Sequence, residues 1–239
     1  MRRFFAPLEN FSDKTVTLDA DETRHLRDVL RLHVGDEVSV FDGAGKEFAC
    51  TISEIGKKET KLSVIGETEP ASPESPFSIT IAATVLNGEK YDLIVQKAVE
   101  LGVTKLIPLI TLRCDVKAKD AAKRMSRWRR IAMEATKQTG RAKLMEIAMP
   151  IVFATLIPLL PDKGTILFSE REGRGFDTIV CDHSTTALYG PKGGWDDAEL
   201  KLAAEHDITI VTLGGRVLRA ETAAIAITAI LQHRFGDLN

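Results

Sequence analysis

The 239-residue sequence has little of what marks several classes of protein. It has three cysteines, none of them in a CxxC pair, so we expect neither a disulfide framework nor a zinc or other metal site. No uninterrupted apolar run approaches the roughly 18 residues that a membrane span needs. The N-terminus also lacks an apolar stretch of signal-peptide length. These absences predict a cytoplasmic protein that does not enter a membrane.

The sequence also has little net charge, at −2, but its positive charges are unevenly distributed. Between residues 117 and 143 there are ten Lys or Arg and only two acids, a local excess of +8. Because most of the acids needed for i,i+4 pairing are missing, a helix over this run would not neutralise itself. A solvated helix face and a phosphate-binding surface for nucleic acid both fit the pattern.

A proline-rich segment divides the chain. Three of the nine prolines fall within residues 68–76, where neither a helix nor a central strand can continue, so we interpret this segment as a linker. Before it, a helix is expected over residues 21–31. Apolar and polar residues alternate at strand period over residues 15–18, 37–41, 47–55 and 61–65. The pattern predicts a small β-barrel domain over residues 1–70.

After the linker, strands alternate with helices over residues 77–239, which form the predicted second domain. Strands are expected at residues 78–86, 103–110, 164–169 and 208–213, and helices at 89–101, 119–138, 198–205 and 221–235. Alternation of this kind predicts an α/β domain with a mainly parallel sheet covered on both faces. Ligands of such sheets bind beyond the carboxyl ends of the strands, here after Leu86, around Gly190 and after Leu213.

Two loops at these positions carry candidate ligand-binding sequences. Residues 189–195 (YGPKGGW) have three glycines that allow close approach of the backbone to a ligand. Residues 213–222 (LGGRVLRAET) follow a predicted buried strand and lead into an Ala- and Ile-rich helix. By itself, the first loop also fits a plain turn. The second also fits a connector in which Glu221 complements the helix dipole.

Taken together and in this order, the two loops resemble the signatures of the RsmE family of 16S rRNA uridine-N3 methyltransferases, in the SPOUT superfamily. The family's glycine loop, GPEGG followed by an acid, resembles residues 190–194 with Glu199. Its C-terminal signature, LG-x-[RIV]-LR-x-ETA, resembles residues 213–223, and further matches lie at residues 25–36, 97–103 and 134–141. Lys192 stands where the family has Glu and inverts a charge beside the expected ligand.

The resemblance implies an α/β methyltransferase domain with a C-terminal trefoil knot, preceded by a PUA-like β-barrel domain. General rules would not predict the knot, since knots are almost absent from proteins. It also implies S-adenosyl-L-methionine as cofactor and a homodimer formed near the knot, although the helix over residues 223–231 also fits a monomer core. The expected cofactor-binding residues are Leu86, Gly190, Gly193, Gly194, Leu213, Gly214, Arg216, Val217 and Leu218.

The implied reaction transfers a methyl group to N3 of uracil, which becomes nucleophilic when it loses its proton. Arg219 is the candidate for a fixed cation beside the developing negative charge, because a guanidinium stays charged and donates in a fixed fork. Glu221 is expected to orient Arg219, although a structural salt bridge within the loop fits the same pair. The five histidines are scattered along the chain, so no general base is identified.

The implied partner is 16S rRNA in the small ribosomal subunit. Trp128 lies within the basic run, where it fits either a base-stacking residue or, at helical spacing, a core residue. Two other functions fit the same residues, namely an RNA-binding assembly factor without catalysis and a methyltransferase acting on tRNA or on a ribose hydroxyl. The expected RNA-binding residues are Arg2, Arg3, Arg24, Arg27, Arg31, Lys123, Arg124, Arg127 and Arg141.

Overall fold

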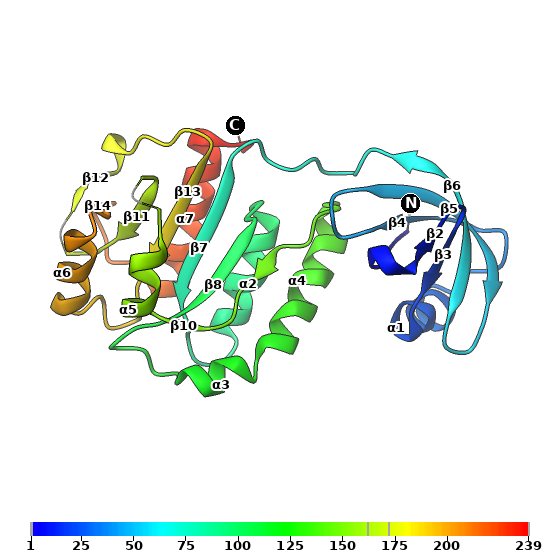
Figure 1. The fold of residues 1–239 in the computed structure, drawn as a ribbon, viewed down its shortest axis with the longest axis horizontal. Helices are drawn as coiled ribbons and strands as arrows, with labels where there is room; N and C mark the ends of the chain where they lie inside the picture. Colours follow the sequence, from blue (N-terminus) through cyan, green and yellow to red (C-terminus); the bar gives the residue numbers. More distant parts are fainter. Residues whose placement is uncertain (1, 162, 172, 239) are drawn as a thin grey trace. The chain divides into compact units, whose positions relative to one another are not determined.

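The structure is a computed structural model that describes residues 2–161, 163–171 and 173–238. The chain forms two compact units. The N-terminal unit takes residues up to 74 and also residues 133–144, and the C-terminal unit takes residues 75–132 and those from 145 onward. In Figure 1 the blue and cyan strands β1–β6 belong to the first unit and the yellow to red elements to the second, while the green helix α4 contributes residues to both.

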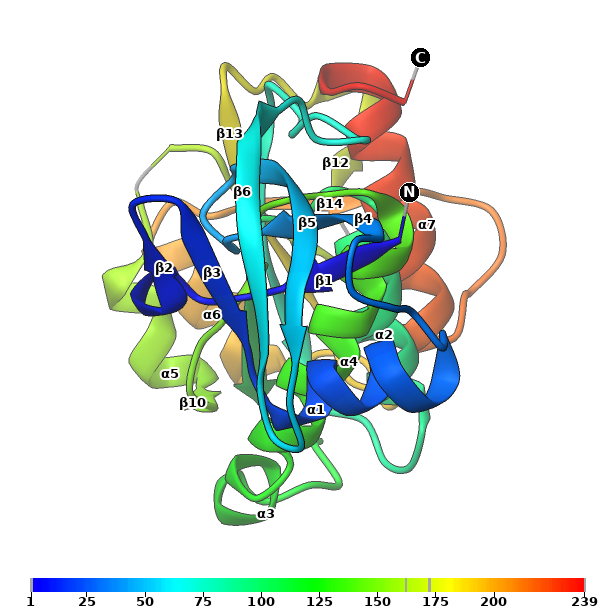
Figure 2. The same ribbon diagram turned by 90° about the vertical axis from the view of Figure 1, so that its right-hand side faces the viewer.

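The N-terminal unit is built on one six-stranded sheet in the order β1-β4-β5-β6-β3-β2, which faces the viewer in Figure 2. Neighbouring strands are antiparallel except β1 and β4, which are parallel. Alternating apolar residues of the strands are buried in one core, as the strand-period pattern predicts, among them Val16 and Leu18, Val38 and Val40, and Cys50 and Ile52. The strands are β1 (Arg3–Phe5), β2 (Phe11–Ser12), β3 (Thr15–Leu18), β4 (Glu37–Phe41), β5 (Glu47–Ile55) and β6 (Thr60–Thr68).

One short helix interrupts the strands of this unit. Helix α1 (Ala20–Arg24) begins at Asp19, whose carboxylate accepts from the backbone N–H groups of residues 21 and 22. The helix then widens into a single π-helical turn, His25–Val29. A helix in the predicted place is therefore confirmed, although its second half has π rather than α geometry.

The end of helix α4 (Met125–Thr139) belongs to the N-terminal unit because buried charges bind it there. The Arg3 guanidinium donates to the carbonyl oxygens of Lys137 and Arg141, each at 2.9 Å, and pairs with Glu47 at 2.8 Å. The Lys137 ammonium forms an ion pair with Glu22, whose side chain is only 5% exposed. Carbonyl groups at a helix C-terminus lack helical partners, so Arg3 both caps this end and carries positive charge to it.

The C-terminal unit is built on one sheet with the order β10-β8-β7-β13-β11-β14-β12, and with β9 beside β8. All of its strand pairs are parallel, which confirms the predicted α/β class. The strands are β7 (Ser78–Thr84), β8 (Lys105–Ile110), β9 (Glu146–Ile147), β10 (Ile151–Val152), β11 (Thr165–Phe168), β12 (Arg174–Gly175), β13 (Ser184–Tyr189) and β14 (Thr209–Thr212).

Helices cover both faces of this sheet, as a parallel sheet requires. Helices α5 and α6 pack with the strands around one apolar core, while α2 and α7 contact each other and α7 contacts β13 (Figure 1). The predicted basic helix is divided between α3 and α4 by a break at residues 123–124. The remaining helices are α2 (Lys90–Glu100), α3 (Ala118–Ala122), α5 (Phe153–Leu156), α6 (Asp197–Glu205) and α7 (Ala220–Phe235), with 3₁₀ turns at Leu8–Asn10, Ile157–Leu159 and Phe176–Thr178.

Strand β13 is the main element that the sequence analysis missed. Its sequence, STTALY, begins with three hydroxyl residues and does not have the apolar pattern of a central strand, yet it lies between β7 and β11. Thr185 is buried, but its hydroxyl is not left without a hydrogen bond, because it donates to the carbonyl of Gly164 at 2.9 Å. Polar residues therefore occupy the middle of the sheet.

The segment between β11 and β13 takes a long path around β14. It places β12 outside β14, at the edge of the sheet, before the chain returns to β13 on the other side of β11. The end of α7 lies against this returning segment, since Arg234 donates to the carbonyls of Phe176 and Asp177 at 2.8 and 2.9 Å. The last helix is thus attached to the segment that returns to β13, and the expected knot stays a prediction.

Removal of the Lys137 ammonium tests the buried charges of the N-terminal unit. Lys137→Met leaves the Glu22 carboxylate buried without its partner, which typically costs about 3–5 kcal/mol in free energy of unfolding. Both tryptophans of the chain lie in the C-terminal unit, so tryptophan fluorescence would not report unfolding of the N-terminal unit. Hydrogen exchange of the amides in strands β3 to β6 measures this loss instead. Glu22→Gln in the same chain should recover most of it.

The loss should also depend on pH. Burial raises the pKa of Glu22, and the ion pair with Lys137 opposes this rise. Without Lys137, the carboxyl is protonated in the folded state at acidic pH and becomes a buried unpaired charge as the pH rises through its raised pKa. The deficit of Lys137→Met should therefore be larger at pH 8 than at pH 5, and equal deficits would assign the loss to something other than Glu22.

Candidate functional site

A cavity of about 360 Å³ lies beyond the carboxyl ends of β11, β13 and β14. Its volume is within the range of small-molecule sites, and its place follows the rule for parallel sheets. Eight of the nine residues expected to bind the cofactor line it, namely Gly190, Gly193, Gly194, Leu213, Gly214, Arg216, Val217 and Leu218.

Leu86 is the ninth of these residues and does not line the cavity. It is buried after the end of β7, where its carbonyl accepts from Arg124 Nη1 at 3.4 Å. The end of β7 instead supports the neighbouring strand, because the Thr84 hydroxyl donates to the Tyr189 carbonyl at 3.0 Å. Leu86 thus lies outside this cavity lining, and its contact with the cofactor stays a prediction.

The indole of Trp195 holds the glycine loop against the sheet. Its Nε1 donates to the carbonyl of Phe168, the last residue of β11, at 2.8 Å, and the side chain is fully buried. A Cβ atom on Gly190 would lie 2.9 Å from the same Nε1, which is closer than side chains tolerate. Gly190 must therefore remain glycine for the loop to pass over the indole.

Helix α6 begins immediately after this loop, with Asp196 and Glu199 forming a capping box. Glu199, the acid noted downstream of the glycine loop, also accepts from the backbone N–H of Leu112 at 2.8 Å. Arg113 donates to the Gly193 carbonyl at 3.1 Å and to Asp196 at 3.2 Å. The loop after β8 thus holds the glycine loop in place through Arg113. No sequence motif indicated this role for Arg113.

The inner wall of the cavity is aromatic and apolar. Phe168 and Tyr189 stack with ring centroids 5.6 Å apart, and the Tyr189 hydroxyl hydrogen-bonds with Thr228 at 2.9 Å. Burial raises the pKa of Tyr189, and its hydrogen bond only partly opposes that rise. The phenol therefore stays protonated near neutral pH and is no candidate for a general base there.

The second loop, residues 213–219, presents apolar side chains to the cavity. Leu213, Val217 and Leu218 line it and are 40%, 78% and 39% exposed, so they have surface available for a ligand. Together with the open backbone of the glycine loop, they offer both apolar contact and backbone donors and acceptors. These are the features that an adenine ring and its attached groups need.

Charged side chains also line the cavity. Glu170 enters it directly after β11, Lys192 from the glycine loop and Arg216 from the second loop. Glu170 was missed by sequence analysis because residues 170–186 had no predicted element from which its position could be placed. The lining therefore combines one acid with two cations among the residues that the structure describes.

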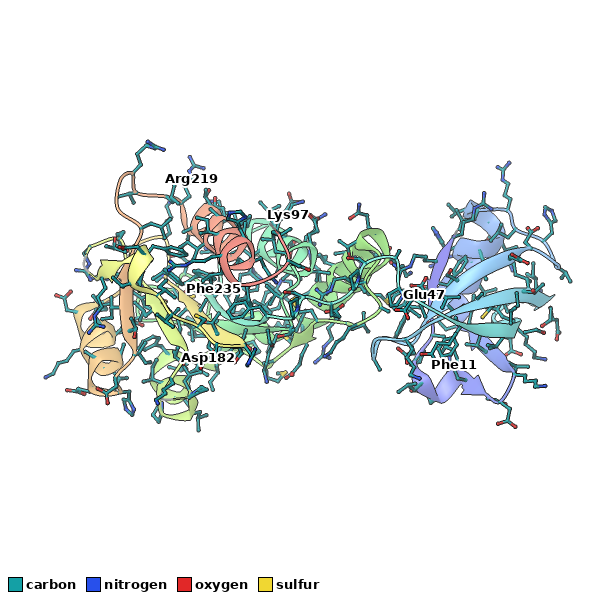
Figure 3. All side chains as sticks on the ribbon, turned by 90° about the horizontal axis from the view of Figure 1, so that it is seen from above. Phe11, Glu47, Lys97, Asp182, Arg219 and Phe235 are labelled. Carbon is teal, nitrogen blue, oxygen red and sulfur yellow. The ribbon has the colours of Figure 1, made fainter. Side chains whose placement is uncertain are left out.

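Arg219 and Glu221 stand at the start of α7, beside the cavity. Arg219 is the N-cap residue, is exposed and projects outward in Figure 3. It lies between Leu218 and Ala220, which both line the cavity. Glu221 pairs with Lys90 at 3.3 Å. Burial raises the pKa of Glu221, but its backbone hydrogen bond and the charges of Lys90 and Arg219 outweigh burial and lower it.

The expected RNA-binding residues divide into exposed and buried groups. Arg2, Arg24, Arg31, Lys123 and Arg127 are exposed, while Arg27 and Arg124 are partly so. Several of these have acidic neighbours, since Lys123 pairs with Asp120 at 2.9 Å, Arg127 with Asp92 at 2.6 Å and Arg24 with Asp21 at 2.8 Å. Arg129 and Arg130 on the same helix are exposed and have no acidic partner within the described part of the chain.

Arg3 and Arg141 do not fit the expectation of phosphate contact. Arg3 is bound to Glu47 and to backbone carbonyls, while Arg141 is 3% exposed and pairs with Glu74 at 2.6 Å. Both guanidinium groups neutralise internal acids, so they present little charge to solvent. Trp128 is likewise fully buried, with its ring centroid 4.6 Å from that of Tyr91, which confirms the core alternative and excludes base stacking.

Two further observations concern the described residues as a whole. Among them, no group of three or more His, Cys, Asp or Glu side chains is arranged to hold a metal ion. In that same part of the chain, no helix has the length and apolar character to cross a membrane.

Comparison with known proteins extends the similarity to both units. Residues 73–232 match a family described as an RNA methyltransferase domain, and residues 18–65 match an RNA methyltransferase PUA domain. The chain is 30% identical to ribosomal RNA small subunit methyltransferase E of Bacillus subtilis, over 96% of each chain. It is 32% identical to the protein of that name from Rickettsia conorii, over 92% of this chain and 89% of that one.

Solved structures agree with the sequence relatives. Ribosomal RNA small subunit methyltransferase E from Neisseria gonorrhoeae, bound to S-adenosyl methionine, is 33% identical over 100% of both chains, with a TM-score of 0.91. A putative methyltransferase from Legionella pneumophila, in complex with the same cofactor, is 32% identical over 99% of both, with a TM-score of 0.90. Because the similarity extends over both units and their connecting segments, the chain belongs to the RsmE family of RNA methyltransferases.

Proposed function

We propose that this protein uses S-adenosyl-L-methionine to methylate N3 of a uridine in the 16S rRNA of the small ribosomal subunit. The observation that carries the proposal is the cavity built by the two motif loops, in a chain whose solved relatives bind this cofactor in full-length structures. Because the substrate is ribosomal RNA, the proposed activity belongs to the cytoplasm.

The cavity fits the cofactor in size and in the kinds of group that line it. About 360 Å³ accommodates a nucleoside with an amino-acid chain in a bent form. Leu213, Val217 and Leu218 would contact the adenine, and the backbone of Gly190, Gly193 and Gly194 would supply hydrogen bonds. Gly214 and Arg216 complete the proposed cofactor site on the facing loop.

The chemistry needs orientation and charge stabilisation more than it needs a reactive side chain. When bound, S-adenosyl-L-methionine supplies the methyl group, whose bond to sulfur breaks with the electron pair left on sulfur as N3 attacks and its proton passes to water. The protein holds the uracil in line with this bond and stabilises the negative charge of the deprotonated ring. Arg219 is proposed for that second task, because it lies between Leu218 and Ala220, which both line the cavity, and its side chain is exposed and makes no N-cap hydrogen bond.

Each unit contributes its own proposed RNA-binding residues. Those of the N-terminal unit are Arg2, Arg24, Arg27 and Arg31, and those of the C-terminal unit are Lys123, Arg124 and Arg127, to which the structure adds Arg129 and Arg130. Arg3 and Arg141 are omitted because they are buried in ion pairs. Phosphate contacts of this kind position an RNA without reading its sequence.

We also propose a homodimer. Along α7, the apolar residues Ile225, Ala226, Ala229 and Ile230 are only partly covered within the chain, and Val180 is 84% exposed. An apolar surface of this kind marks an interaction site more often than a solvent face. Sedimentation equilibrium should give twice the chain mass at micromolar concentration, and a monomer there would contradict the proposal.

Two measurements together test the proposed function. Calorimetric titration should give a saturable heat with S-adenosyl-L-methionine, which a non-catalytic assembly factor would not give. Mass mapping of rRNA from a deletion strain should then lack one methyl group on a uridine base of 16S rRNA. A missing methyl on tRNA or on a ribose would instead support the other methyltransferase activities.

Arg219→Ala should lower the rate of methyl transfer by about 10²–10³ with little change in cofactor affinity, because loss of one donor to developing charge has this effect. Arg219→Lys should recover part of the rate, since an ammonium lacks the planar fork. Single-turnover assays on small subunits at saturating cofactor measure this. Arg219 is structural if the alanine variant reacts at the parent rate, or if it loses cofactor binding and thermal stability together.

Arg129→Glu with Arg130→Glu should weaken RNA binding and leave cofactor affinity unchanged, because these unpaired charges lie outside the cavity lining. The slope of log affinity against log salt should shrink by about 0.9 for each duplex phosphate that is no longer neutralised, or about 0.7 on single strands. Lys201→Glu on α6, an exposed lysine 3.9 Å from Glu205, is the matched control. Equal RNA affinity in the double variant and the control would show that the helix is only a solvated face.

A further inference from the structure

Glu170 is the one acidic side chain among the described residues that line the cavity. It follows the carboxyl end of β11 directly, one residue after Ser169, whose N–H donates to the Val211 carbonyl at 2.9 Å. The backbone at its base is thus attached to the neighbouring strand β14. The backbone next to Glu170 is therefore held at the edge of the sheet, which limits where its carboxylate can lie.

The carboxylate lies over the end of the glycine loop. A Cβ atom built on Gly194 would overlap Glu170 Oε1, and the φ of Gly194 is +71°. Any side chain at Gly194 would push the carboxylate away and would also strain the backbone. The glycine thus leaves room for an acid to reach the loop on the cavity side.

The acceptor capacity of this carboxylate is largely free. Among the described residues its one ion-pair partner is Arg171, at 3.9 Å, and the Arg171 guanidinium is already bound to Asp197 at 2.9 Å and to the Trp195 carbonyl. The Glu170 side chain is 36% exposed, so it is open to a ligand in the cavity. An ionised carboxylate has about four acceptor positions, and these need donors.

We infer that Glu170 binds the two neighbouring hydroxyl groups of the cofactor's ribose and thereby contributes to cofactor affinity. The inference depends on the proposed cofactor site. Two carboxylate oxygens match two adjacent hydroxyl donors, and an acid after a parallel strand, near a glycine-rich loop, binds ribose hydroxyls in dinucleotide sites as well. Attraction to a cationic ligand group is the weaker alternative, because Lys192 and Arg216 in the same lining oppose it.

The test compares two ligands that share the ribose and differ in charge. S-adenosyl-L-methionine has a sulfonium cation, and S-adenosyl-L-homocysteine has a neutral sulfur in its place. Glu170→Gln and Glu170→Ala in the full chain should each weaken both ligands about tenfold, with the ratio of the two affinities unchanged. Asp197→Asn is the control, because Asp197 also pairs with Arg171 but does not line the cavity. It should leave both affinities within about twofold of the parent.

A 2′-deoxy analogue of S-adenosyl-L-homocysteine completes the cycle. It should bind the parent more weakly than the ribose form does, and Glu170→Gln should weaken it by much less than about tenfold. An effect confined to the sulfonium ligand would overturn the inference, since Glu170 would then act on charge. Unchanged affinities in Glu170 variants would also overturn it while leaving the proposed function intact, whereas a parent protein that binds neither ligand would overturn both.

Discussion

The indole of Trp195 is the contact on which the geometry of the cavity depends. It joins the end of β11 to the glycine loop after β13, two parts of the chain that the segment carrying β12 separates. Its Nε1 can donate to the Phe168 carbonyl only if the loop passes directly over the ring, and Gly190 permits that passage. This contact therefore sets the position of the loop relative to the end of β11.

Backbone groups and charged side chains line different parts of the cavity. The glycine loop offers backbone groups and is held from behind by Arg113 and the capping box of α6. Charged side chains approach from three strand ends, with Glu170, Lys192 and Arg216 each supplied by a different loop. The arrangement offers the proposed cofactor both backbone groups and charges of either sign.

The basic run has two physical roles rather than one. Lys137 pairs with the buried Glu22, and the buried Arg141 pairs with Glu74, so these charges hold the end of α4 within the N-terminal unit. Arg129 and Arg130, on the first half of the same helix, remain exposed without acidic partners among the described residues. A count of charges along the sequence cannot separate these roles, because burial and pairing are decided by other segments of the chain.

Local patterns in the sequence were enough to predict a break near residues 68–76, the parallel sheet and the places of the two cavity loops, since apolar period, proline positions and glycine motifs act over short distances. Three features required the tertiary structure. Strand β13 is central only because its hydroxyls find partners in neighbouring segments, Glu170 reaches the cavity only because β11 lies beside β13 and β14, and Arg3 and Arg141 are buried by distant acids. Each depends on contacts between residues far apart in the chain, which no local pattern encodes.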